Sequence, residues 1–231
     1  MQTAKKTIIE LDSCGEKLSK ELLDIAIPNN PDLKTRAKIT SILRASNELM
    51  TQFAFDFLNK CPFLGNEAKS LFCKKTDILV TTVFNLVQKK FHPFTHPSES
   101  QSLSLVAIGG FGRGEMAPYS DIDLLFLSNK RQTGWAKSVV GSVLYLLWDL
   151  KFKVGHSSRT ISDCVQLGLD DLTIRTSMLE KRYLCGSRDL FEELETTLKK
   201  RVFSKKASNF VEGKLSERAE RHLKHANARY M

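Results

Sequence analysis

The spacing of apolar residues changes near residue 100, from a helical period to shorter apolar runs. Apolar positions three or four residues apart recur within residues 16–26, 32–60 and 66–87, and this pattern predicts amphipathic helices. Prolines and asparagines at residues 28–31 separate the first two of them. We therefore expect an N-terminal helical region over residues 1–98.

Short apolar runs appear from residue 99 onward. Residues 103–108 and 121–127 are rich in Val, Ile, Leu and Phe, which predicts two buried strands. A helix over residues 134–149 then leads to a third strand at 152–160. If this strand lies parallel to the one at 121–127 in the same sheet, the helix forms a right-handed crossover between them.

The remaining segments read as helices, apart from one that ends in a turn. The turn closes residues 182–186. The helices are expected at residues 161–167, 171–179 and 188–201, and from about 208 to the end. Together the pattern predicts an α/β (α+β) core over residues 99–200, with a small mixed sheet and flanking helices. A basic helix over residues 201–231 would begin a following helical region.

A glycine-rich segment separates the first two predicted strands. Gly109, Gly110, Gly112 and Gly114 predict a loop whose backbone can come close to a ligand. Arg113 adds a guanidinium suited to phosphate oxygens. The segment is therefore a candidate phosphate-binding loop.

Two acids are the only polar residues in the run 121–127. On a strand, Asp121 and Asp123 project from the same face, roughly 6 to 7 Å apart along the chain. Because two such carboxylates repel each other, the pair favours a bound cation, and Mg²⁺ binds carboxylate oxygens together with substrate phosphates. A metal held in this way can activate a hydroxyl and stabilise a leaving pyrophosphate.

The combination of these motifs is more specific than either alone. A strand, Gly109-Gly110, an arginine-containing loop and the Asp121-x-Asp123 strand, with ten residues between Gly110 and Asp121, resemble the DNA polymerase beta-like nucleotidyltransferase superfamily. The resemblance implies that fold, and transfer of a nucleoside monophosphate from a nucleoside triphosphate to a hydroxyl.

Residues 109–115, 118–123 and 148–160 resemble, more narrowly, the N-terminal catalytic domain of the bacterial PII uridylyltransferase/uridylyl-removing family. Residues 179–186 and 220–225 resemble it as well. The resemblance implies that UTP with Mg²⁺ donates UMP to a tyrosine hydroxyl of the nitrogen-regulatory PII protein and that pyrophosphate is released.

The resemblance also assigns roles to residues. Asp121 and Asp123 would hold Mg²⁺, Gly109 and Gly110 would cradle the phosphates near Arg113, and Ser120 is a further candidate nucleotide-binding residue in the turn before the acids.

The chain departs from the family pattern in two places. Superfamily members usually carry a third carboxylate on the next core strand, but residues 152–160 contain no acid, and His156 is an alternative polar group there. The complete family enzyme continues into HD and ACT domains, and this chain has no His-Asp dipeptide. We therefore expect a fragment or shortened product without uridylyl removal or glutamine control.

Composition and charge bear on the kind of protein and on its partners. The net charge is +9, and residues 199–231 hold ten Lys or Arg against three Glu, which we interpret as a solvated helix face rather than a nucleic-acid site. No apolar run approaches the ~20 residues of a membrane span, and no signal peptide is evident, so we expect a cytoplasmic protein. The five cysteines are scattered without a C-x-x-C pair, and we expect reduced thiols.

Two other functions stay open. One is a different nucleotidyltransferase of the same fold, such as an adenylyltransferase, because no residue visibly reads the base. The other is an inactive module that binds PII or a nucleotide, an alternative that the missing third acid favours.

Overall fold

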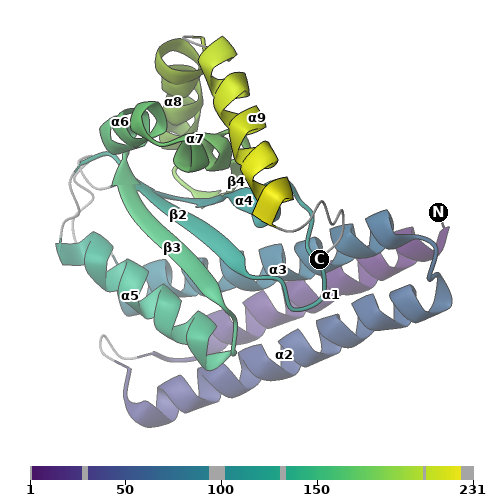
Figure 1. Ribbon diagram of the computed structural model, residues 1–231. Helices are drawn as coiled ribbons and strands as arrows, with labels where there is room; N and C mark the ends of the chain where they lie inside the picture. The colour runs from purple at the N-terminus through teal and green to yellow at the C-terminus, as the bar shows by residue number, and fades with distance from the viewer. Residues whose placement is uncertain (1, 28–30, 94–101, 131–133, 205–206, 225–231) are drawn as a thin grey trace.

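The computed structural model describes residues 2–27, 31–93, 102–130, 134–204 and 207–224. A four-stranded sheet lies at the centre, with the long N-terminal helices on one side and shorter helices on the other (Figure 1). This arrangement confirms the predicted mixed α/β fold. The boundary predicted at residues 98 and 99, the break at 28–30 and the end of the basic tail at 225–231 lie outside the described residues.

Three long helices form the N-terminal region: α1 (Gln2–Asp24), α2 (Leu33–Lys60) and α3 (Gly65–Leu86). The prediction that the first helix begins near residue 16 is wrong, because a buried stripe that includes Leu11, Leu18 and Leu22 continues the helical spacing toward the N-terminus. A Cβ at Gly15 would lie 2.7 Å from the Cγ2 atom of Ile78, so α1 packs closely on α3.

The ends of α2 and α3 differ in how they are capped. Asp32 caps α2 by accepting a hydrogen bond from the Thr35 amide at 2.8 Å. The helix α3 begins at Gly65, after Leu64, and has no side-chain cap. Beyond its C-terminus the chain forms a π-helical turn, η1 (Val87–Phe91).

The sheet has the strand order β3-β2-β1-β4, and its bounds are β1 (Leu103–Ala107), β2 (Ile122–Ser128), β3 (Val154–Thr160) and β4 (Arg182–Gly186). β1 is antiparallel to both neighbours, and β2 is parallel to β3. The helix α5 (Gly134–Asp149) connects the two parallel strands, as expected for a crossover.

β4 corrects the sequence interpretation, which took residues 182–186 only as a segment that ends in a turn. These residues pair with β1 at the edge of the sheet, with a register shift between Leu105 and Val106. The strand is short and only partly buried, so its apolar pattern is weak. Pairing with β1, rather than local sequence, makes it a strand.

Alternating side chains of the sheet enter two separate hydrophobic clusters. Leu105, Leu124 and Phe126 belong to the first cluster, with α1, α2, α3 and α5. Leu125 and Leu127 belong to the second, with the helices of the opposite face. Successive residues of a strand point to opposite faces, so the two clusters identify the face on which each strand residue lies.

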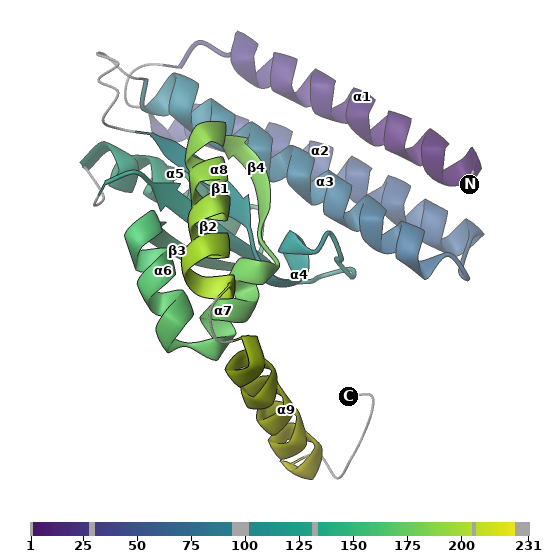
Figure 2. The ribbon, with the colours of Figure 1, turned by 90° about the horizontal axis from the view of Figure 1, so that it is seen from above.

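The C-terminal elements cover the second face. They are α6 (Ile161–Asp170), α7 (Leu172–Leu179), α8 (Arg188–Leu198) and the π-helical turn η2 (Lys199–Phe203), and α9 (Ala207–Lys224) follows them in the chain. The helix predicted from about residue 208 is confirmed as α9 over residues 207–224, and it projects away from the sheet (Figure 2). No helix among these described ranges is both long and apolar enough to cross a membrane.

Candidate functional site

The glycine-rich segment after β1 forms one helical turn, α4 (Gly109–Gly112), and not the open loop predicted from sequence. Gly109 has a φ of +62°, which favours glycine, and the Ile108 amide before it donates to the Asp123 carbonyl at 3.1 Å. A Cβ at Gly109 would lie 3.1 Å from the Oδ2 atom of Asp123. The turn and the second acid are therefore in direct proximity.

The two acids occupy different environments. β2 begins at Ile122, so Asp121 precedes the strand and is exposed, whereas Asp123 lies within it and is half-buried. The expectation that both acids are strand residues is thus half right. Burial raises the pKa of Asp123, and the negative charge of Asp121 raises it further.

A second glycine limits the space around Asp123 from the neighbouring strand. Gly155 of β3 is the register partner of Asp123, and a Cβ at this position would overlap the Asp123 Oδ1 atom. The carboxylate therefore lies between Gly109 and Gly155, with no hydrogen bond or ion pair to any residue that the structure describes. Sequence reasoning missed Gly155, although a glycine inside a strand signals a close approach.

Two further polar residues of β3 share the face of Asp123. The register pairs Ser157 with Leu125 and Arg159 with Leu127, and the two leucines belong to the second hydrophobic cluster. The Ser157 Oγ and the Arg159 Nη1 are buried and have no hydrogen-bond partner among the described residues. The alternation of Gly155, Ser157 and Arg159 was the signal in the sequence that could have identified this face.

His156 lies on the opposite face from Asp123. It is the register partner of Leu124, and its exposed ring meets Trp148 edge to face, with centroids 6.3 Å apart. This placement removes His156 as a partner for the Asp123 carboxylate. Within the described ranges no three His, Cys, Asp or Glu residues come close enough to form a metal-binding group.

Arg113 is held by two acids at the exposed end of α4. Its Nη1 atom is 2.7 Å from Glu180 and its Nε atom is 3.3 Å from Glu115. The hydrogen bonds that Arg113 donates to Glu180 and Glu115 raise the pKa of its guanidinium. A phosphate at this position would have to compete with these carboxylates for the guanidinium.

Ser120 closes the turn that precedes the acids. Its Oγ atom accepts a hydrogen bond from the Ala117 amide at 3.0 Å, and its amide donates to the Ala117 carbonyl at 3.2 Å. The side chain therefore shapes the approach to Asp121, and its predicted contact with a nucleotide stays a prediction.

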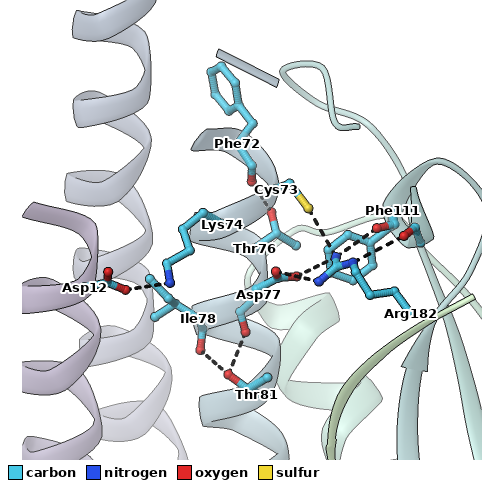
Figure 3. Close-up of polar contacts among 11 residues, drawn as sticks. Asp12, Phe72, Cys73, Lys74, Thr76, Asp77, Ile78, Thr81, Phe111 and Arg182 are labelled. Atoms are coloured by element: carbon cyan, nitrogen blue, oxygen red, sulfur yellow. Dashed lines mark hydrogen bonds and ion pairs between the residues drawn. The ribbon is translucent and has the colours of Figure 1, made fainter. Parts of the chain in front are cut away.

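Arg182 is a supporting residue that sequence reasoning missed. From β4 it donates to both Asp77 carboxylate oxygens at 2.8 and 3.0 Å, and to the carbonyls of Phe111 at 2.9 Å and Gly112 at 3.3 Å (Figure 3). The same guanidinium lies 5.3 Å from the centroid of the Phe111 ring. Arg182 thus ties the α4 turn to helix α3.

Comparison with known proteins agrees with this geometry. A family model described as a nucleotidyltransferase domain matches residues 96–183. The chain is 42% identical over 196 residues to a bifunctional uridylyltransferase/uridylyl-removing enzyme of Ruegeria pomeroyi, covering 85% of this chain and 22% of that protein. It is 47% identical over 156 residues to the enzyme of the same name from Cereibacter sphaeroides, covering 68% of this chain and 17% of that protein.

A third relative of that name, from Phenylobacterium zucineum, is 45% identical over 167 residues, which cover 72% of this chain and 18% of the relative. The chain spans about a fifth of the length of the curated relatives it matches. These matches confirm the predicted resemblance to this family and the nucleotidyltransferase character of the core.

Proposed function

This chain carries a nucleotidyltransferase domain, and from that premise we propose that it transfers UMP from UTP to a tyrosine of the nitrogen-regulatory PII protein, with Mg²⁺ bound. The observation that carries the proposal is the half-buried Asp123 carboxylate between Gly109 and Gly155, with Asp121 beside it. The names of the relatives, uridylyltransferase/uridylyl-removing enzymes, support UTP as the donor and nucleotidyl transfer as the reaction class.

Asp121 and Asp123 fit the requirements of a magnesium site. Both are hard oxygen donors, and the Asp123 carboxylate has no partner among the described residues while it is repelled by Asp121. Mg²⁺, when bound to them, would neutralise negative charge at the phosphates and align the attacking hydroxyl.

The protein's own contribution is to place the triphosphate against these acids. Gly109 and Gly110 bring backbone close to the phosphates without a Cβ, and Arg113 and Ser120 lie at the two ends of the segment that follows. The Ser157 Oγ and the Arg159 Nη1, buried atoms on the same sheet face, offer further donors.

Transfer forms a bond from the tyrosine oxygen to the α-phosphorus and breaks the bond from that phosphorus to the pyrophosphate oxygen. The phenolic proton is lost to water, and pyrophosphate leaves with the electron pair of the broken bond. Because a tyrosine hydroxyl has a pKa of ~10, the site must promote its deprotonation at neutral pH. We also propose that this reaction takes place in the cytoplasm, with PII and UTP as partners and no nucleic acid.

A binding module without transfer is the second candidate. The observation that favours it is that no third acid joins Asp121 and Asp123 within the described residues. Such a module would bind PII or a nucleotide through the same surface and release no pyrophosphate.

A transfer assay separates these candidates and adenylyl transfer. The chain is mixed with Mg²⁺, radiolabelled UTP or ATP, and PII with unlabelled ATP and 2-oxoglutarate. Label on PII from UTP alone supports the proposal, and label from ATP alone supports an adenylyltransferase. No label from a folded preparation that still binds UTP would establish the binding module and overturn the proposal.

A further inference from the structure

A cavity of about 650 Å³ lies between two of the N-terminal helices and loops of the nucleotidyltransferase core. It is lined by α2 and α3 on one side and by residues 116–120 and 150–153 on the other. Its lining includes Ser120 but neither Asp121 nor Asp123, so it is distinct from the proposed metal site. Its volume lies in the range of small-molecule sites, which is roughly 300 to 1,000 Å³.

A buried lysine lines this cavity. Lys75 is only 7% exposed, and its Nζ atom donates a hydrogen bond to the Asn47 Oδ1 atom at 2.9 Å. The same atom lies 5.5 Å from the centroid of the Phe152 ring. Burial lowers the pKa of Lys75 to about 8, and no carboxylate pairs with it among the described residues.

The charge around the cavity favours an anion. Lys151 and Lys153 lie on its lining with Lys75, and Glu48 is the acid that lines it. A buried ammonium that hydrogen-bonds only to an amide is destabilised relative to water, and an anionic partner would offset that cost.

The walls of the cavity favour a ligand whose remaining part is apolar. They include five large apolar residues, Phe55, Phe72, Met116, Leu150 and Phe152. Phe55 and Phe72 meet edge to face with ring centroids 5.1 Å apart, which makes one wall aromatic. A ligand with a flat ring and one acidic group matches both the walls and the lysine.

Backbone strain is concentrated at the same cavity. Tyr119 and Lys151 line it, with φ values of 67° and 64°, and they are the two non-glycine residues with positive φ in the described part of the chain. Such conformations cost free energy and are found preferentially at ligand-binding and switch segments.

We propose that this cavity binds a small organic anion with a flat apolar body, with its carboxylate or sulfonate on Lys75 and its ring between Phe55 and Phe152. The ligand also contacts residues 116–120, the turn that leads into Asp121. Occupation of the cavity therefore holds the segment that positions the first acid. The site requires neither nucleotide nor metal, so it goes beyond the proposed transfer activity.

Titration with 8-anilinonaphthalene-1-sulfonate, a fluorescent aromatic anion, tests the proposal on the whole 231-residue chain. We expect saturable binding of one probe per chain, and a shift of the Met116 methyl signal in NMR spectra while that of Met178, in the second hydrophobic cluster, stays in place. N-phenyl-1-naphthylamine, which lacks the sulfonate, should bind at least about tenfold more weakly.

Variants test whether Lys75 provides the positive charge that binds the sulfonate of the probe. Lys75→Met keeps the length and apolar stem and should weaken probe binding about tenfold or more, whereas Lys60→Met at the exposed end of α2 should leave it unchanged. Thr51→Trp narrows the cavity and should weaken both probes, which gives a second variant if Lys75→Met fails to fold.

Three results would overturn the proposal. The first is that Lys75→Met and Thr51→Trp, both folded by thermal unfolding, bind the probe as tightly as the unchanged chain. The second is that the uncharged probe binds as tightly as the sulfonate. Competitive displacement of the probe by UTP would assign the cavity to the nucleotide substrate, and the transfer proposal would survive that result.

Discussion

Two half-buried aspartates, Asp77 on α3 and Asp123 on β2, have opposite surroundings. Both oxygens of Asp77 accept hydrogen bonds from Arg182, at 2.8 and 3.0 Å. The Asp123 carboxylate has no such partner within the described residues and lies between two glycines.

The difference separates a structural carboxylate from one that is available to a ligand. Removing a charge from water is unfavourable unless a partner compensates for it. The partner of Asp77 is internal and joins β4 to α3, whereas the partner proposed for Asp123 is a cation from solution. The two residues should therefore respond in opposite ways when each is neutralised.

Asp123→Asn should cause the largest loss of transfer, by at least about 100-fold, because it removes a proposed metal ligand at the reacting phosphate. The fold should be retained, since the carboxylate makes no internal bond among the described residues. Initial rates of UMP transfer and thermal unfolding measure the two properties. Asp77→Asn is the matched control and should lower stability far more than Asp123→Asn does. Equal transfer rates for Asp123→Asn and the unchanged chain would remove this residue from the mechanism.

Gly155→Ala should reduce transfer by about 10- to 100-fold without touching a charged group, because the added Cβ overlaps the Asp123 Oδ1 atom and displaces the carboxylate. The rate at saturating UTP and its dependence on Mg²⁺ concentration measure the effect. Gly141→Ala in α5 is the control, since nothing lies within 4 Å of a Cβ there. It should increase stability by roughly 0.5 to 1 kcal/mol. If both variants transfer at the same rate, the glycine does not position Asp123.

Arg182→Met tests whether the ion pair of Asp77 with Arg182 stabilises the fold. It removes the bonds to Asp77, Phe111 and Gly112, and it should lower the free energy of unfolding by about 2 to 3 kcal/mol, since the pair is only partly buried. Urea unfolding measures this loss. The exposed pair of Arg188 with Glu192 provides the control, and Arg188→Met should cost less than about 1 kcal/mol. Similar losses for the two arginine variants would contradict the role of Arg182 as an anchor.

The pH dependence of stability should show the smallest effect. Burial and the charge of Asp121 raise the pKa of Asp123 in the folded chain. The folded state therefore binds more protons than the unfolded state, and stability should fall as the pH rises from the ordinary aspartate pKa of about 3.9 through the raised value.

Asp123→Asn should remove this decrease, so that the variant is the more stable protein at neutral pH without metal and loses its advantage near pH 4. Urea unfolding across this pH range measures the difference. Added Mg²⁺ should stabilise the unchanged chain and not the variant. A difference in stability that does not depend on pH would argue against a raised pKa.

Local pattern was sufficient for much of the fold. The helices α2 and α5 follow from helical spacing, and β1 and β2 follow from short apolar runs with β-branched residues. β4 did not follow, because Arg182–Gly186 is a partly buried edge strand whose partner β1 is distant in the sequence. The α4 turn did not follow either, since four glycine-rich residues have no strong preference and Arg182 anchors their carbonyls from β4.

Local spacing was enough to predict the candidate site residues: the glycines at 109 and 110, the acids at 121 and 123, and their order between two strands. These features are local, so spacing along the chain is enough to find them. Three other relations come from the folded chain: Gly155 faces Asp123, His156 lies on the opposite face, and Arg182 binds Asp77. Those relations depend on strand register and on packing between segments as far apart as α3 and β4, and the periodicity of a single segment contains neither.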